Sequence, residues 1–291
     1  MNPETHVFKK ADGLEIRADV YRSEEAAGRR PVVAYFHGGA LIMGERTWIN
    51  ERFVEDCLDN GYVFVSLDYR LAPETRLPEI IDDARDGLSW IRSEGRDLFG
   101  ADDARVAAAG SSAGGYLALM SGLFEWKPKA TVSFYGYGDL IGPWYSKPDP
   151  FYCSQGEVSE TEARGAVGEA PLSQGERTRH PFYLYCRQKG IWPEEISGHD
   201  PHREPEFFNP YCPLQNVTAR YPPTMLLHGD ADTDVPYKQS VMMADELAHA
   251  GVEHEFITIP NGPHVFDKEM EAPVVDAAFE KVRAFLARHL G

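Results

Sequence analysis

Short apolar runs alternate with amphipathic stretches along most of this chain, and this alternation restricts its fold more than any other feature. Runs typical of buried strands lie at residues 32–36, 62–67, 106–109, 131–135, 223–228 and 253–259, and helix-like stretches at 48–60, 80–92, 116–120, 236–250 and 274–289. Strands that alternate with helices predict an α/β fold, a mostly parallel sheet with helices on both faces. We expect residues 5–9 and 14–21 to form an antiparallel hairpin at one edge, followed by a polar loop at 24–30.

Residues 139–221 lack this alternation and are rich in proline, glycine and aromatic residues. A structureless loop of that length is uncommon inside a compact domain. We therefore expect a mainly helical lid inserted over the carboxyl edge of the sheet, with helices at 160–167 and 181–189. The predicted domains are a core of residues 1–138 and 222–291 and a lid of residues 139–221. Its aromatic residues either line a pocket or form the core of the lid.

The composition limits the partners that the chain can bind. Its 291 residues, 43% of them hydrophobic, suffice for one large domain with a full core. A formal net charge of −17 disfavours nucleic acid and anionic membrane surfaces, because both repel an acidic protein. The longest apolar runs are shorter than the ~18 residues that a membrane span needs.

Cysteine usage and the N-terminal residues favour a cytoplasmic protein. The four cysteines are scattered without a CxxC pair, which is typical of reduced thiols in a chain of this length. A bond between Cys153 and Cys186 stays open as an alternative. Residues 1–6 are polar and lack the apolar stretch of a signal peptide. The oligomeric state is left open.

A single GxSxG pattern at residues 110–114 lies between a predicted strand and a predicted helix. In that context the hydroxyl of Ser112 is pushed out of the surface, with the helix N-terminus behind it. Small residues at 110 and 114 let the chain turn sharply without clashing. Ser112 is therefore the candidate nucleophile, provided that the chain supplies a base and an orienting acid.

Candidates for the base and the acid follow later strands. His264 lies on a Pro/Gly loop after the last predicted strand and is the best candidate base. Of three aspartates after the preceding strand, Asp232 is preferred as the acid because it lies in the middle of its loop. Asp234 is expected to cap the next helix, and Asp230 to brace the loop. The carboxyl ends of parallel strands share one edge, so these side chains can converge.

A glycine-rich turn after the first predicted parallel strand is the candidate oxyanion hole. Gly38, Gly39 and Ala40 can aim backbone amides at a substrate, and the amide of Ala113 is a further donor at a helix N-terminus. His37 is expected to brace this turn, because no acid is placed to orient it as a base.

Three segments resemble those of known proteins. Residues 35–40 (YFHGGA) are similar to an HGG-type oxyanion segment, residues 68–74 (DYRLAPE) to a segment of that same sequence, and residues 110–115 (GSSAGG) to a nucleophile elbow. Together they resemble the hormone-sensitive-lipase-like (α/β-hydrolase-3 type) carboxylesterases of the α/β-hydrolase fold. The motifs, with the two C-terminal loops, extend over residues 32–266.

The resemblance implies an α/β-hydrolase fold with an inserted lid and a serine-hydrolase site. In that site, the catalytic triad would be Ser112, Asp232 and His264. The oxyanion donors would be Gly39, Ala40 and Ala113, with Gly38 in the same turn.

The chain departs from the family pattern at three places. Ala40 stands where glycine is commonest, so its methyl group is expected to narrow the acyl side of the pocket. Ser111 stands where the family often has an acidic residue. We expect no N-terminal cap of the usual kind, its place being taken by the lid.

Two further groups of residues are expected to be structural. Buried charges need partners, so Arg70 is expected to pair with Asp68, Glu74 or Asp82 beneath the site. The sequence HDPH at 199–202 resembles a metal-ligand cluster, but no further ligand is suggested nearby, and we interpret it as a surface loop.

The sequence therefore predicts a serine carboxylesterase that hydrolyses small to medium acyl esters through an acyl-enzyme, with no cofactor and no metal. Its partner is a small-molecule ester. An aryl formamidase, an amidase or an exopeptidase on the same triad is the alternative. A non-catalytic small-molecule receptor is a third hypothesis, which an intact triad disfavours.

Overall fold

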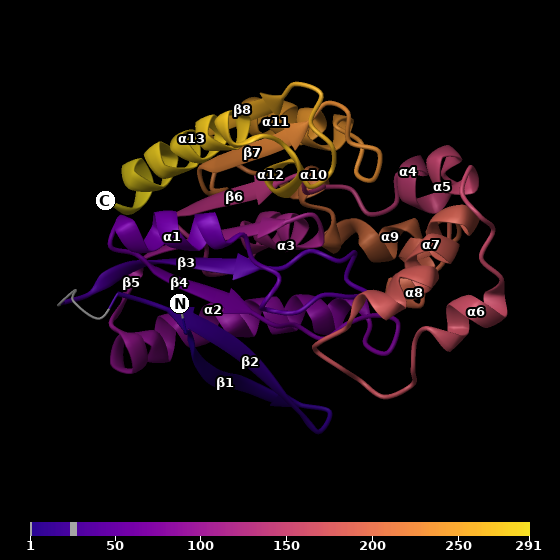
Figure 1. Ribbon diagram of the computed structural model, residues 1–291, viewed down its shortest axis with the longest axis horizontal. Helices are drawn as coiled ribbons and strands as arrows, with labels where there is room; N and C mark the ends of the chain where they lie inside the picture. Colours follow the sequence, from indigo (N-terminus) through magenta and orange to yellow (C-terminus); the bar gives the residue numbers. More distant parts are fainter. Residues whose placement is uncertain (1, 24–27) are drawn as a thin grey trace.

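In the computed structural model, which describes residues 2–23 and 28–291, the strands form one sheet in the order β1-β2-β4-β3-β5-β6-β7-β8 (Figure 1). The strands are β1 (Glu4–Ala11), β2 (Leu14–Tyr21), β3 (Arg30–Phe36), β4 (Val63–Leu67), β5 (Ala101–Ser111), β6 (Ala130–Phe134), β7 (Thr224–Gly229) and β8 (His254–Ile259). The hairpin β1–β2 pairs antiparallel with β4 at one edge, and the remaining pairs are parallel. The predicted sheet and edge hairpin are confirmed.

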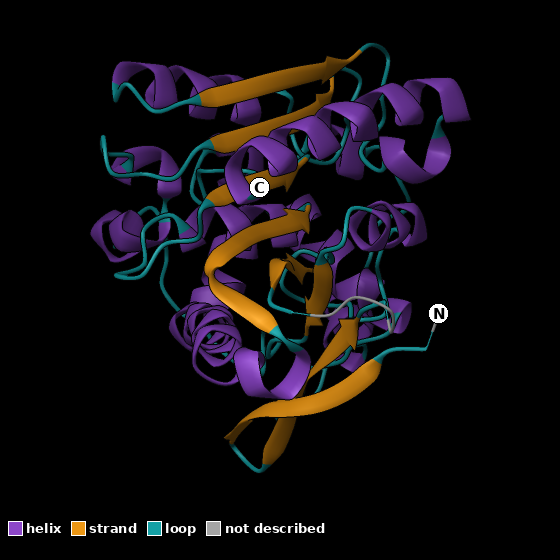
Figure 2. Ribbon diagram, turned by 90° about the vertical axis from the view of Figure 1, so that its left-hand side faces the viewer, coloured by secondary structure: helices purple, strands orange, loops and turns teal. Residues whose placement is uncertain are grey.

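Helices cover both faces of the sheet (Figure 2). Helices α1 (Glu51–Asp59) and α13 (Ala272–Leu290) pack on one face, and α2 (Leu77–Phe99), α3 (Ala113–Ser121) and α11 (Lys238–His249) on the other. Every residue of β3 and β4 is buried, because a parallel sheet covered on both faces exposes neither side of its central strands. Helix α12 (Phe266–Glu269), between β8 and α13, was not predicted.

Residues 139–221, named the cap segment here, are a series of short helices. They are α4 (Pro143–Ser146), α5 (Pro150–Cys153), α6 (Glu160–Gly165), α7 (His180–Lys189), α8 (Trp192–Ser197), α9 (Pro205–Phe208) and α10 (Pro213–Asn216), with 3-10 turns at Arg177–Arg179 and Asn209–Tyr211. Helices α4 to α9 lie together beyond the carboxyl end of β3, on the right of Figure 1. The two predicted helices correspond to α6 and α7. That the segment acts as a lid stays a prediction.

The segment after β4 carries buried charges, as expected, but Arg70 pairs with other residues than those predicted. Its guanidinium bonds Asp83, with Nε and Oδ2 2.7 Å apart, and also contacts Asp12. The expected partner Asp82 is exposed on α2, whereas Asp83 lies on the helix face that packs against the sheet and is fully buried. The register of α2, which the sequence leaves uncertain by a residue, decides between these neighbours.

Four further expectations concern the cysteines, the HDPH loop at 199–202, membrane-spanning helices and the polar loop at 24–30. All four cysteines are free, so Cys153 and Cys186 form no bond. His199 contacts Glu204 and the ring of Phe207, and no group of metal-ligating side chains occurs among the described residues. None of the helices in the described part of the chain is long and apolar enough to cross a membrane. Of the predicted polar loop at 24–30, residues 24–27 lie outside the described residues, and Arg30 begins β3.

Candidate active site

The turn between β5 and α3 holds Ser112 in an unusual backbone conformation. Its φ of 54° and ψ of −119° lie in a region that costs an L-residue about 1–3 kcal/mol. A Cβ atom on Gly110 would lie 2.2 Å from the carbonyl oxygen of Gly114, and one on Gly114 would lie 1.9 Å from that of Phe36. Both glycines are therefore required for the sharp turn that presents the Ser112 hydroxyl to the cavity above the sheet.

Loops after β7 and β8 bring an imidazole and a carboxylate to this serine. Nε2 of His264 lies 3.0 Å from Oγ of Ser112, and its Nδ1 lies 2.7 Å from Oδ2 of Asp232. With Asp232 accepting from Nδ1–H, Nε2 is left with a lone pair that accepts the serine hydroxyl proton. The three residues that the sequence singled out are thus in contact, in the relation that a nucleophile, base and orienting acid require.

Asp232 is fully buried and has four hydrogen-bond donors. Its Oδ1 accepts from the amides of Asp234 and Val235, and its Oδ2 accepts from His264 and from Nε2 of His228, 3.1 Å away. Burial raises the pKa of Asp232, but the bonds from the two histidines outweigh burial and hold the pKa well below its ordinary value of 3.8. The carboxylate is therefore charged at neutral pH and fixed in orientation.

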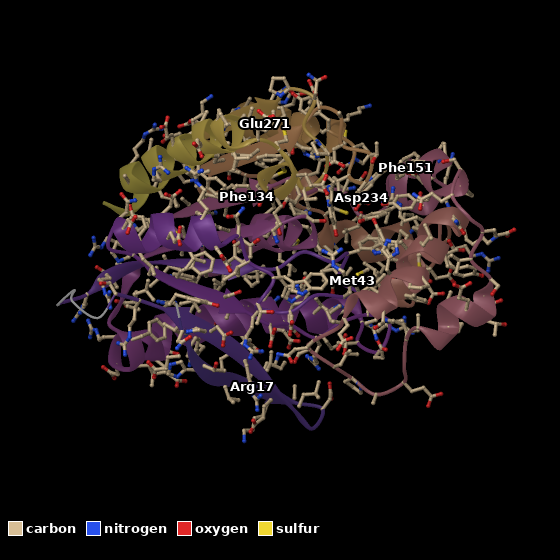
Figure 3. The ribbon with its side chains drawn as sticks, in the orientation of Figure 1. Arg17, Met43, Phe134, Phe151, Asp234 and Glu271 are labelled. Atoms are coloured by element: carbon tan, nitrogen blue, oxygen red, sulfur yellow. The ribbon has the colours of Figure 1, made fainter. Side chains whose placement is uncertain are left out.

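Asp234 does not cap a helix, which corrects the expectation from the sequence. Helix α11 begins at Lys238 without a side-chain cap. The Oδ1 atom of Asp234 instead accepts from the hydroxyl of Tyr183 and from Arg187, whose Nη1 is 2.7 Å away (Figure 3). Its Oδ2 lies 3.5 Å from Nε2 of His264. The carboxylate that the sequence assigned to the cap of α11 therefore pairs instead with Arg187, a buried residue of the cap segment.

Asp230 braces the loop as expected, since its Oδ1 accepts from the amide of Asn261 on the neighbouring loop at 2.6 Å. This bond connects the loop that carries Asp232 to the one that carries His264.

Two carboxylates set the basicity of His264. Burial lowers its pKa, but the charge of Asp234 and the hydrogen bond to Asp232 outweigh burial, so the pKa is raised above the ordinary 6.5. The ring of Tyr135 packs edge-on against the imidazole, with centroids 4.8 Å apart. The imidazolium form is therefore stabilised on both nitrogens.

The turn after β3, residues 38–44, is named the glycine turn here. Gly39 has a φ of 115° and Ala40 a φ of 57°. A Cβ on Gly39 would lie 2.1 Å from the carbonyl oxygen of Met43, so only glycine fits there. No described residue accepts a hydrogen bond from the amides of Gly39, Ala40 or Ala113. Gly38, Gly39 and Ala40 line the same cavity as Ser112.

His37 and Ser111 contact the glycine turn and the neighbourhood of Ser112. His37 bonds the carbonyl oxygen of Gly38 through Nδ1 at 2.7 Å and stacks on Tyr69, and burial lowers its pKa to about 4. It therefore stays neutral and braces the turn, as expected. Ser111, in place of an acidic residue, accepts from the hydroxyl of Tyr35 at 2.9 Å.

The cavity over Ser112 has a volume of about 400 Å³. The cap segment contributes two of its aromatic residues, Tyr152 and Tyr183, and also Arg177 and His180. Trp48, from the loop before α1, lines it as well and carried no signal in the sequence. Its ring lies under the guanidinium of Arg177, 5.2 Å away, and that contact between distant segments appears only in the folded chain.

A family model described as alpha/beta hydrolase fold matches residues 33–268. Similar curated proteins include the non-reducing polyketide synthase ausA of Emericella nidulans, 28% identical over 99% of this chain and 14% of that protein. Another is the non-reducing polyketide synthase trt4 of Aspergillus terreus, 30% identical over 91% of this chain and 13% of that protein. The chain spans about one seventh of the length of these relatives.

Solved structures share the fold over nearly the whole chain. An alpha/beta hydrolase superfamily protein from Enterococcus faecalis has a TM-score of 0.77 and 22% identity, covering 98% of both chains. A bacterial heroin esterase has a TM-score of 0.74 and 21% identity, covering 100% of this chain and 84% of the other. The esterase of Pyrobaculum calidifontis has a TM-score of 0.70 and 23% identity, covering 95% and 82%.

Proposed function

The chain belongs to the alpha/beta hydrolase fold family, and on this premise we propose that it is a serine carboxylesterase acting on small to medium acyl esters. One observation carries the proposal. Ser112, His264 and Asp232 form a continuous chain of contacts, with distances of 3.0 Å and 2.7 Å, at the floor of a cavity. The glycine turn lines the same cavity, and its amides at Gly39 and Ala40 have no acceptor among the described residues, which supports the proposed oxyanion hole.

Acylation would proceed from these residues. The Ser112 hydroxyl attacks the ester carbonyl while its proton moves to Nε2 of His264, and Asp232 stabilises the imidazolium. The amides of Gly39, Ala40 and Ala113 would donate hydrogen bonds to the carbonyl oxygen as negative charge develops on it. The imidazolium then gives its proton to the departing alkoxide, and the acyl-enzyme remains.

Deacylation repeats the same transfers with water as the nucleophile. His264 takes a proton from the attacking water and returns it to the Ser112 oxygen as the acid leaves. These reaction steps need no cofactor and no metal, so the proposed binding partner is the small-molecule ester alone. The cavity of about 400 Å³ suits small and medium acyl chains, and the cap segment would shape it through Tyr152 and Tyr183. The free cysteines favour a reducing, cytoplasmic setting.

Hydrolysis of p-nitrophenyl butyrate by the purified protein tests the proposal. We expect Ser112→Ala to lower kcat by at least about a thousandfold, since the oxyanion donors alone leave only a small residual rate. The matched control is Ser121→Ala, at the other end of α3, which should keep its activity. Full activity in Ser112→Ala overturns the assignment. Parallel assays on a formanilide and an aminoacyl anilide distinguish an esterase from a formamidase, an amidase or an exopeptidase.

A further inference from the structure

The glycine turn is strained and depends on support from outside. Ala40 and Leu41 are both left-handed, with φ values of 57° and 60°, which side-chain-bearing residues rarely adopt. Within the turn, the amides of Ile42 and Met43 both donate to the carbonyl oxygen of Gly39 at 2.9 Å. That leaves the carbonyl groups farther along the turn in need of donors, because buried carbonyls are nearly always hydrogen-bonded.

The core supplies one of those donors, the amide of Ala72 to the carbonyl oxygen of Leu41 at 2.8 Å, and the cap segment supplies those for Ala40, Ile42 and Gly44. Nε1 of Trp192 donates to the carbonyl oxygen of Ala40 at 3.0 Å, and Nε of Arg179 donates to that of Ile42 at 2.6 Å. The backbones of Gly44 and Gly175 exchange two hydrogen bonds, of 2.7 and 3.0 Å. In Figure 3 the labelled Met43 marks where the turn approaches the helices of the cap segment.

Both cap side chains are fixed in place. Trp192 is fully buried and its ring stacks on Tyr145, with centroids 3.9 Å apart. Arg179 is buried and paired with Glu74, and it also donates to the carbonyl oxygen of Ala72 at 2.7 Å. The part of the cap segment that carries Arg179 and Trp192 is therefore held in place beside the glycine turn.

The bond from Trp192 bears directly on the proposed oxyanion hole. A peptide unit is planar, so the N–H of Ala40 points away from the carbonyl of Gly39, which the turn itself holds. The next peptide unit carries the Ala40 carbonyl, which Trp192 holds. With the units on both sides of its Cα anchored, Ala40 keeps its left-handed conformation and its amide keeps its direction.

We propose that Trp192 is a positioning residue for the oxyanion hole, acting through its hydrogen bond to the Ala40 carbonyl. This inference rests on the proposed esterase function. Trp192 lies on α8 and is not among the residues that line the cavity over Ser112. Its effect is therefore confined to states in which a negatively charged oxygen occupies the hole, which arise in both acylation and deacylation.

Trp192→Phe tests this, because phenylalanine keeps an aromatic ring against Tyr145 and removes the N–H donor, together with some buried ring volume that the control below also removes. We expect kcat for p-nitrophenyl butyrate to fall about tenfold with KM nearly unchanged, as is typical when an interaction specific to the transition state is lost. The matched control is Trp144→Phe. Trp144 also stacks on Tyr145 but has no bond to the glycine turn, so its kcat should stay within about twofold.

A trifluoromethyl ketone supplies the second measurement. Ser112 adds to its carbonyl carbon, the serine proton moves to His264, and the resulting hemiketal oxyanion occupies the hole. In Trp192→Phe the inhibition constant should rise by the same factor as kcat/KM falls. In Trp144→Phe both should stay near the values of the unaltered protein. A loss of packing alone would instead lower the melting temperature in both variants without this proportionality.

If Trp192→Phe fails to fold, Gly175→Ala perturbs the same glycine turn through Arg179. The added Cβ would lie 2.8 Å from Cδ of Arg179 and from Cδ1 of Leu71, and we expect it to displace the Arg179 side chain from the Ile42 carbonyl. The same kcat loss with unchanged KM is expected. If Ser112→Ala is inactive but Trp192→Phe behaves like Trp144→Phe, the positioning role is overturned and the esterase function stands. If Ser112→Ala is active, the function itself fails.

Discussion

At the scale of single residues, His264 stands between two carboxylates that are held differently. Asp232 is fixed by four donors and faces Nδ1, whereas Asp234 approaches Nε2, the nitrogen that also faces Ser112. In neutral His264, the Nε2 lone pair and the Asp234 carboxylate repel each other. Protonation turns that repulsion into attraction, and this change, together with the hydrogen bond to Asp232, raises the pKa of His264.

The pH dependence of kcat/KM should follow from that pKa. The neutral imidazole is the active base, so activity is lost as pH falls through the pKa of His264. Because this pKa is raised, the midpoint of the acid limb should lie above 6.5. Rates on p-nitrophenyl butyrate between pH 5 and pH 9 would measure it, and a profile without an acid limb would contradict His264 as the base.

Asp234→Asn should move that acid limb to lower pH. Removing the carboxylate next to Nε2 lowers the pKa of His264, so more of the enzyme is in its active form under mildly acid conditions. The matched control is Asp230→Asn, which removes a charge from the same loop away from the imidazole and should leave the midpoint in place. An unshifted limb in Asp234→Asn would show that Asp232 alone sets the basicity.

Local sequence was sufficient to select the candidate triad but not to find the partner of Asp234. The order of strands and loops was enough to select Ser112, Asp232 and His264, which the structure places in contact. Asp234 was assigned to a helix cap because capping is local, and its partner Arg187 lies 47 positions earlier in a segment without periodicity. A single sequence contains no local pattern that predicts contacts between distant segments.

At the scale of elements, the turn from β5 to α3 leaves no room for side chains at its two glycines. Gly114→Ala places a methyl group 1.9 Å from the Phe36 carbonyl, and backbone atoms have nowhere to move. We expect the free energy of unfolding to fall by more than about 3 kcal/mol, measured by urea denaturation.

The control for that substitution is Gly165→Ala at the end of α6. An added Cβ there has no atom within 4 Å, so stability should be unchanged or higher by up to about 1 kcal/mol, since alanine favours a helix. Equal losses of stability in the two variants would contradict a steric requirement for glycine in the elbow.

Sequence patterns predicted the long elements well and the short ones poorly. The strands β3 to β8 lie at the predicted apolar runs, and α2 and α13 have clear amphipathic faces. The exception is the start of β5, at Ala101, because its first residues are polar and only 106–109 was predicted. Several helices of the cap segment are four residues long and begin at proline. One helical turn contains no complete apolar period, so only α6 and α7 were predictable there.

At the scale of the whole molecule, Arg187 connects the cap segment to the core. It is fully buried, pairs with Asp149 and Asp234, and lies over four aromatic rings, among them Tyr145 and Tyr152. Burial lowers the pKa of Arg187, but electrostatic interactions with Tyr183, Asp234 and two further tyrosines outweigh burial and hold the pKa well above its ordinary value. The guanidinium is therefore a permanent charge at the junction of the two parts.

Arg187→Met should lower the free energy of unfolding by about 3–5 kcal/mol, because it leaves two carboxylates without their partner. Urea denaturation followed by tryptophan fluorescence and by circular dichroism measures the loss. The matched control is Arg76→Met, since Arg76 also joins the core to the cap segment but is exposed, bonding only the Glu195 carbonyl. It should cost less than about 1 kcal/mol. Equal losses would mean that the buried connection contributes no more to stability than the exposed one.

The attachment of the glycine turn to Gly175, Arg179 and Trp192 has a consequence for how substrate range can diversify in such a chain. A chimera that receives residues 139–221 from another hydrolase would inherit a new pocket together with foreign supports for Ala40. Its catalytic power would survive only if the matching stretch at 38–44 were transplanted with it. New specificities should therefore evolve through paired changes in these two distant stretches.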